Sequence, residues 1–168
     1  MLIFLFCQAC ILANQDPLAK SLADRLYGIV FLATPHRGAD SATLLNNLLR
    51  ASLLHSQKPF VADLERNSGA IQSINDDFRH YSSTLELRSF YETIKTNIGF
   101  SNLLIVEKDS ATLGYPNEQS ALLNATHRDI CKYQSPADPN FISLRNALVT
   151  MSQDVARKGQ IENPSRIK

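Results

Sequence analysis

An uninterrupted apolar run at residues 29–33, Ile-Val-Phe-Leu-Ala, constrains the fold more than any other feature of the sequence. Gly28 precedes the run, and Thr-Pro-His-Arg-Gly follows it at residues 34–38. A short run without polar residues is typical of a parallel strand covered on both faces. Such a strand needs neighbouring strands and covering helices, so the run predicts a parallel sheet with helices between its strands.

Hydrophobic patterning predicts three helices around this strand. Residues 2–14 are apolar on all sides, which is typical of a buried helix. Apolar residues recur at steps of three and four over residues 44–53 and again over residues 71–78. These two segments are therefore expected to be amphipathic helices that pack on the sheet.

Two further strands and a last helix complete the pattern. Residues 85–91 and 103–106 are short apolar runs, as expected of strands. Asp138 and Pro139 are suited to cap and begin a helix of about four turns. The residues from 157 to 168 have little to bury and are expected to form a flexible tail.

The expected architecture is α/β, with about three parallel strands flanked by helices in a domain over residues 1–156 and a tail over residues 157–168. A buried strand normally has a neighbour on each side. The sheet is therefore expected to be incomplete at its N-terminal edge, where a partner strand could pair with it.

Charge and cysteine content argue against several classes of protein. Seventeen Lys and Arg against 16 Asp and Glu give a net charge of +1, without the basic stripe that nucleic acid would require. Three cysteines, Cys7, Cys10 and Cys131, are not the even set of a disulfide framework. Cys7 and Cys10 have the spacing of a redox or metal pair, but small buried helix residues are the favoured interpretation.

The N-terminal apolar run has two interpretations. It is too short for a membrane-spanning helix, which needs about 20 residues. It resembles the apolar part of a signal peptide, but no basic residue occurs before Lys20. A buried helix is favoured over a signal peptide.

Polar residues with useful chemistry follow the expected strands at their carboxyl ends, where parallel sheets place reactive groups. Glu92 ends the second strand, Asp109 follows the third, and His127 lies before the last helix. A carboxylate can hold an imidazole in one tautomer, which makes it a general base for a hydroxyl. The alternative is that His127 only caps or packs.

Four segments resemble the lipase-like α/β-hydrolase domain of the serine-active-site-containing proteins, which also precedes NACHT and repeat modules in many fungal proteins. They are GIVFLATPHRGAD at 28–40, SFYET at 89–93, IVEKDSATLGYPNE at 105–118 and ATHRDICKY at 125–133. The resemblance implies that the three strands correspond to strands 6–8 of that fold. It also implies a serine in a G-x-S-x-G turn, an acid and a histidine, in that order, without a cofactor or metal.

On this resemblance His127 is the catalytic histidine. Glu92, at the end of the seventh strand, is favoured as the acid over Asp109, which would follow the eighth. The sequence departs from the family in the nucleophile, because Ser41, Ser68 and Ser110 lack the glycines two positions before and two positions after the serine, and no G-x-S-x-G occurs.

These features predict a fragment of a serine ester or lipid hydrolase that is inactive alone. Two alternatives remain: a fragment that works when complemented by the missing strands, and an interaction or signalling module. The resemblance implies an ester or lipid substrate for the full-length family and an intracellular location, with mitochondrial or endoplasmic reticulum membranes as alternatives.

The loop after the first strand holds two further polar residues. His36 either lines the substrate cleft or pins the loop, and the structural role is favoured. Arg37 either contacts an anion or forms a salt bridge within the loop, which is the commoner role.

Overall fold

The computed structural model describes residues 2–36, 68–98 and 101–162. Residues 1–131 and residues 132–168 form two separate compact units. The expected boundary between residues 156 and 157 does not coincide with this division.

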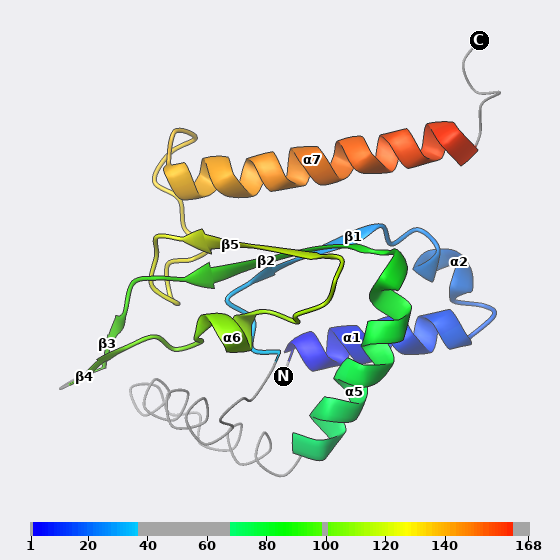
Figure 1. The fold of residues 1–168 in the computed structure, drawn as a ribbon, viewed down its shortest axis with the longest axis horizontal. Coiled ribbons are helices and arrows are strands. Elements are labelled where there is room, and N and C mark those ends of the chain that lie inside the picture. The colour runs from blue at the N-terminus through cyan, green and yellow to red at the C-terminus, as the bar shows by residue number, and fades with distance from the viewer. Residues whose placement is uncertain (1, 37–67, 99–100, 163–168) are drawn as a thin grey trace. The chain divides into compact units, whose positions relative to one another are not determined.

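The first unit is built on a sheet of three parallel strands in the order β1-β2-β5. The strands are β1 (Gly28–Leu32), β2 (Glu86–Glu92) and β5 (Glu118–Leu123). The arrowheads of β2 and β5 point the same way in Figure 1, so the loops that follow them meet at one edge of the sheet. The predicted α/β class with a parallel sheet is confirmed.

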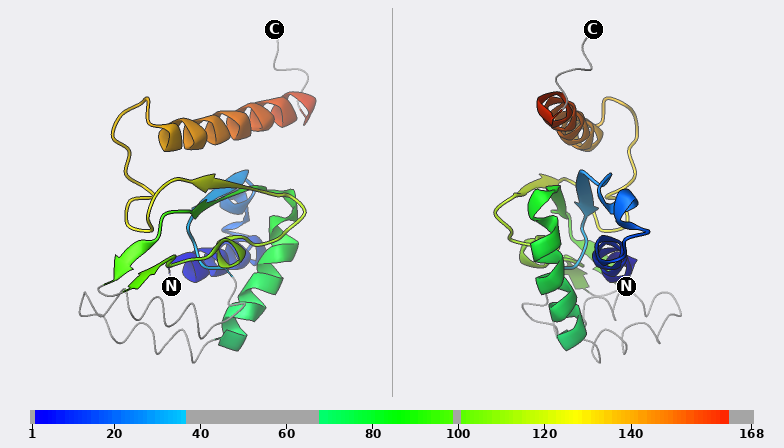
Figure 2. Two further views of the ribbon diagram at one scale, coloured as in Figure 1. Left: turned by 60° about the vertical axis from the view of Figure 1, so that its left-hand side comes forward. Right: turned by 90° about the vertical axis from the view of Figure 1, so that its right-hand side faces the viewer.

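Two helices, α1 (Leu2–Gln15) and α5 (Ser68–Tyr81), lie on the same side of this sheet (Figures 1 and 2). A short helix, α2 (Lys20–Ala23), leads into β1, and a 3-10 turn, η1 (Ser82–Thr84), leads into β2. The core combines buried residues of the helices, the strands and the loop before β5: Cys7, Cys10, Ile11, Ile29, Phe31, Phe78, Leu85, Leu87 and Leu113.

The helices expected over residues 2–14 and 71–78 are therefore confirmed, as is the burial of Cys7 and Cys10 on α1. The helix expected over residues 44–53 lies outside the described residues. In the described ranges, no helix is both long and apolar enough to cross a membrane.

The strand predicted over residues 103–106 is wrong. Residues 101–103 instead form β4 (Ser101–Leu103), which pairs antiparallel with β3 (Thr96–Ile98) in a separate ribbon. Ile105 and Val106 follow β4 as buried loop residues and pack with Ala111 of α6 (Lys108–Ala111). Their apolar character reflects burial in a loop, which a short apolar run does not distinguish from a strand.

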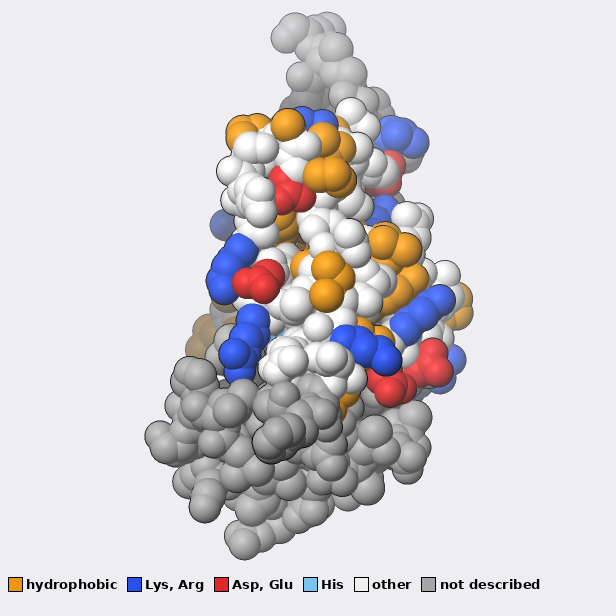
Figure 3. Space-filling view, turned by 90° about the vertical axis from the view of Figure 1, so that its left-hand side faces the viewer, with side chains coloured by type: hydrophobic (Ala, Val, Ile, Leu, Met, Phe, Trp, Pro, Cys, Tyr) orange, Lys and Arg blue, Asp and Glu red, His pale blue; other side chains and the backbone are white. Residues whose placement is uncertain are grey.

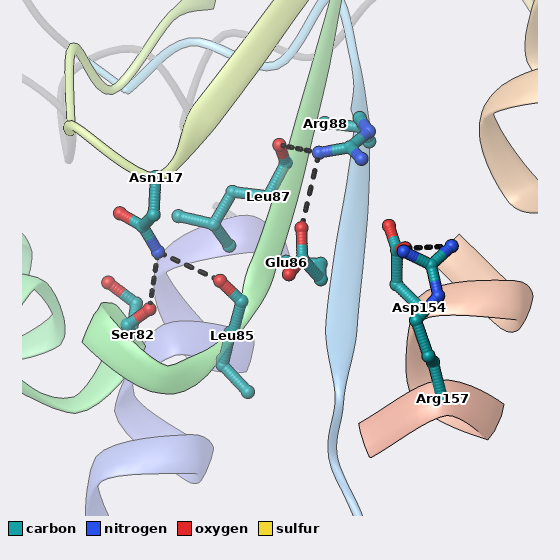
Figure 4. Close-up of polar contacts among 8 residues, drawn as sticks. All are labelled: Ser82, Leu85, Glu86, Leu87, Arg88, Asn117, Asp154 and Arg157. Atoms are coloured by element: carbon teal, nitrogen blue, oxygen red, sulfur yellow. Dashed lines mark hydrogen bonds and ion pairs between the residues drawn. The ribbon is translucent and has the colours of Figure 1, made fainter. Parts of the chain in front are cut away.

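The third parallel strand is β5, which hydrophobic patterning missed. The strand begins with the polar residues Glu118, Gln119 and Ser120, and Ala121 and Leu122 are exposed although apolar, so its sequence lacks the long apolar run of a buried strand. Asn117, just before β5, donates to the carbonyl oxygens of Ser82 at 2.7 Å and Leu85 at 2.8 Å (Figure 4). These bonds fix the start of β5 to the chain that enters β2.

The buried guanidinium of Arg88 lies on β2, the central strand. Its Nη1 donates to the Leu87 carbonyl at 3.3 Å and lies 3.5 Å from the Glu86 carboxylate (Figure 4). The buried charge is thus paired within the same strand, which offsets part of its desolvation cost.

The second unit consists mainly of α7 (Pro139–Glu162). Asp138 caps it as predicted, since its Oδ1 accepts the Asn140 amide at 2.8 Å. The helix has 24 residues instead of about four turns and includes an Asp154–Arg157 ion pair (Figure 4). The first part of the predicted tail, residues 157–162, is helical and continues α7, since polar residues such as Lys, Gln and Glu also favour helices. Residues 163–168 lie outside the described residues.

Ala33, directly after β1, has a left-handed backbone conformation with φ of 42°. Its amide donates to the Phe90 carbonyl at 2.7 Å, and its side chain is buried. We expect Ala33→Val to lower the free energy of unfolding by about 2–4 kcal/mol, because a β-branched side chain fits neither this φ nor this space. Ala33→Gly, which accepts positive φ, should change it by less than about 1 kcal/mol.

Urea denaturation of both variants, followed by circular dichroism, measures the difference. A valine variant as stable as the wild type would contradict the left-handed conformation at Ala33.

Candidate active site

Glu92 and His127 come from adjacent parallel strands. Glu92 is the last residue of β2, and His127 lies in the loop that follows β5. Because β2 and β5 are neighbours in the same direction, their carboxyl ends bring the two side chains together. Nδ1 of His127 lies 3.1 Å from Oε2 of Glu92.

The Glu92–His127 contact combines a buried acid with a partly accessible base. The side chain of Glu92 is 0% exposed, whereas that of His127 is 33% exposed. The distance is that of a hydrogen bond, but among the described residues neither Nδ1 nor Oε2 has a partner that also meets hydrogen-bond angles. Poorly aligned hydrogen bonds are common in catalytic sites without substrate.

This arrangement suits an imidazole for proton transfer. A carboxylate beside Nδ1 favours the tautomer with the proton on Nδ1, and it stabilises the imidazolium when a second proton arrives. Nε2 is then left as the acceptor for a proton from a hydroxyl. The pair can therefore act as the acid and base of a nucleophilic site.

The other carboxylate oxygen of Glu92 is held by the chain itself. The Val106 amide donates to Oε1 at 2.9 Å, and both residues are buried. Val106 belongs to the segment wrongly predicted as a strand. This segment does not extend the sheet, and its Val106 amide instead fixes the Glu92 carboxylate. Sequence patterns carry no signal for this amide, because its role depends on a loop conformation.

Asp109 is not brought to His127. It lies exposed on α6, and no ion pair joins the two residues in the described part of the chain. The expectation that Asp109 follows the eighth strand is wrong, since the third strand of the parallel sheet is β5 and Asp109 precedes it. Of the two predicted acids, only Glu92 contacts the histidine.

His36 is buried in the loop after β1. It is 1% exposed, and its ring meets Phe31 edge-on with centroids 4.4 Å apart. Its amide donates to the Ser110 carbonyl at 2.7 Å, which ties this loop to α6. These contacts support the loop-pinning interpretation. Arg37 lies outside the described residues.

In the described part of the chain, neither Ser68 nor Ser110 forms a hydrogen bond with Glu92 or His127. Ser110 is buried on α6, and Ser68 begins α5. Ser41 lies outside the described residues. In Figure 3, which faces the side to which β2 and β5 point, the described Lys and Arg side chains are interspersed with acidic and hydrophobic ones.

No protein-family model matches the chain, and no curated protein or solved structure is significantly similar to it. The site therefore has to be interpreted from its own geometry, and the relationship to α/β-hydrolases stays a prediction.

Proposed function

We propose that this chain is a fragment of a serine ester or lipid hydrolase that carries the histidine and the acid of the catalytic site. The observation that supports this best is the 3.1 Å contact between His127 Nδ1 and the buried Glu92 carboxylate, at the carboxyl ends of adjacent parallel strands. This is where the α/β-hydrolase arrangement would have strands 7 and 8, with the acid after one and the histidine after the other.

The order of the parts along the chain also supports the proposal. β1, β2 and β5 follow one another in the sheet without interruption, as strands 6, 7 and 8 would. His127 provides the general base and Glu92 orients it. The nucleophilic serine and its oxyanion donors have to come from a segment other than those described.

The chain is expected to be inactive alone. Without a serine alkoxide to form an acyl intermediate, the remaining base has no hydroxyl of its own to activate, and the rate loss amounts to several powers of ten. The substrate class is an ester or lipid, and the cellular location proposed with it is intracellular, including mitochondrial or endoplasmic reticulum membranes.

Hydrolysis of a p-nitrophenyl ester tests this proposal. The 168-residue chain is compared with a chain extended by the residues that the gene encodes in frame upstream. We expect hydrolysis only by the extended chain, provided that it contains a G-x-S-x-G turn. An inactive extended chain with such a turn, or activity of the shorter chain that disappears in His127→Ala, would contradict the proposal.

An interaction module is the alternative, and one observation favours it. Among the described strands, β1 pairs only with β2, and the segment that leads into it exposes Leu18, Leu22 and Tyr27. An extended partner strand could add to this edge by backbone hydrogen bonds. In that case a complex isolated by pull-down would form equally well with His127→Ala and Glu92→Gln.

A further inference from the structure

Thr93 directly follows Glu92 in the SFYET segment, and the acid–histidine pair alone gives it no role. Thr93 lies just after the end of β2, in the loop that leads to β3. It is exposed, so it does not contribute to the core. Its hydrogen bonds nevertheless reach the segment that carries His127.

Hydrogen bonds between the segment that carries Glu92 and the segment that carries His127 continue past the ends of β2 and β5. The Thr93 hydroxyl donates to the carbonyl oxygen of Leu123 at 3.1 Å and lies 3.4 Å from Oδ1 of Asn124. The Ile94 amide donates to the Ala125 carbonyl at 3.1 Å. Residues 123–125 are thus attached to the chain immediately after Glu92.

The other side of His127 is held by its own turn. The Thr126 hydroxyl donates to Asp129 at 2.7 Å, and the Asp129 amide donates back to the Thr126 carbonyl at 3.0 Å. His127 therefore lies within a local turn that directly follows the attachment made by Thr93 and Ile94. The turn fixes the local backbone, whereas the attachment, together with the β2–β5 pairing that sets Glu92 opposite Leu123, relates that backbone to Glu92.

We propose that Thr93 is a positioning residue that keeps Nδ1 of His127 directed at the Glu92 carboxylate. Its hydroxyl joins the acid's strand to the histidine's loop, one residue beyond the acid itself. The inference rests on the proposed function, because it concerns the same acid–histidine pair. Its test, however, reads the imidazole directly and needs no catalytic activity.

The protonation site of His127 provides that readout. In chain labelled with ¹⁵N-histidine, long-range ¹H–¹⁵N correlations at mildly alkaline pH report which ring nitrogen carries the proton. The chain has 4 histidines, so the His127 signals are identified by their absence in His127→Gln. We expect wild type and Thr93→Ser to show only the Nδ1–H tautomer, because both have the hydroxyl.

Thr93→Val, which preserves shape but not the donor, is expected to lose the single Nδ1–H form and show a mixture with Nε2–H. Thr112→Val is the matched control. Thr112 also donates its hydroxyl to a backbone carbonyl, that of Lys108 at 3.1 Å, but this carbonyl belongs to α6 and not to the segment that carries His127. It should leave the His127 signals unchanged.

Circular dichroism establishes that each variant is folded, and Thr93→Ala replaces Thr93→Val if the latter does not fold. An unchanged Nδ1–H form in a folded Thr93→Val or Thr93→Ala variant would overturn the role of Thr93. A mixture in wild type would do so as well. An inactive extended chain with a G-x-S-x-G turn, combined with the expected tautomer change, would contradict the hydrolase proposal and leave the positioning role standing.

Discussion

Replacing His127 by alanine in an extended, serine-containing chain is expected to lower kcat for ester hydrolysis by about 10⁶-fold. The imidazole is the one base in the proposed site, and without it the serine hydroxyl keeps its proton. Because the substrate is bound largely by other groups, KM should change much less than kcat. Steady-state hydrolysis of a p-nitrophenyl ester measures both constants.

The same assay distinguishes the two candidate acids, Glu92 and Asp109. Glu92→Gln is expected to lower kcat by about 10⁴-fold, since the imidazole loses the charge that orients it and stabilises its protonated form. The amide oxygen can still accept the Val106 amide, which now bonds Oε1 at 2.9 Å, so the fold should be retained. Asp109→Asn is the matched control, because the Asp109 side chain is exposed on α6, and it should leave kcat unchanged.

The opposite pattern, with kcat lost in Asp109→Asn and kept in Glu92→Gln, would assign the acid to Asp109. It would also mean that the 3.1 Å contact of His127 with Glu92 is structural. Thermal unfolding of each variant distinguishes loss of activity from loss of the folded state.

The elements with the strongest hydrophobic patterns could be predicted from the sequence. β1 and α1 contribute buried residues to one core, so burial left a clear apolar signal in both. β5 could not be found in this way, because its four central residues are exposed. A strand at the edge of a sheet is defined by backbone bonds to its neighbour, which any residues can make.

Glu92 was placed correctly beside His127 although the third strand was misplaced. The prediction depended only on Glu92 ending one strand and His127 following a later strand, and both remain true with β5 as that strand. The placement of Asp109 after the third parallel strand depended on a strand at residues 103–106, so that placement is wrong, whereas its rank below Glu92 did not depend on it. The roles of the Val106 amide and the Thr93 hydroxyl could not be inferred from the sequence, since each contact depends on the conformation of a loop.

The buried thiol of Cys7 should make this protein sensitive to alkali. Burial, with a smaller contribution from the neighbouring Cys10, raises the pKa of Cys7 from 9.0 to about 12. The unfolded chain would lose this proton near pH 9.0, whereas the folded chain keeps it until about pH 12. Between these values the unfolded state binds fewer protons, so the free energy of unfolding falls as pH rises.

We expect that fall to be on the order of 1.4 kcal/mol for each pH unit from this thiol above its unfolded pKa. The stabilisation is fully present below that pKa and is lost as pH rises towards the folded value. Burial also raises the pKa of Cys10 and of Tyr81, which add to the loss in the same direction. Urea denaturation at a series of alkaline pH values measures the slope.

Cys7→Ala should show a shallower slope, although its stability at neutral pH should be lower by about 1 kcal/mol because a small buried group is removed. Cys131→Ala is the matched control, since that thiol is exposed and should leave the slope of the wild type unchanged. An equal slope in Cys7→Ala and wild type would mean that the Cys7 proton is not retained by folding. The slope would then have to come from the other groups whose pKa burial raises, Cys10 and Tyr81.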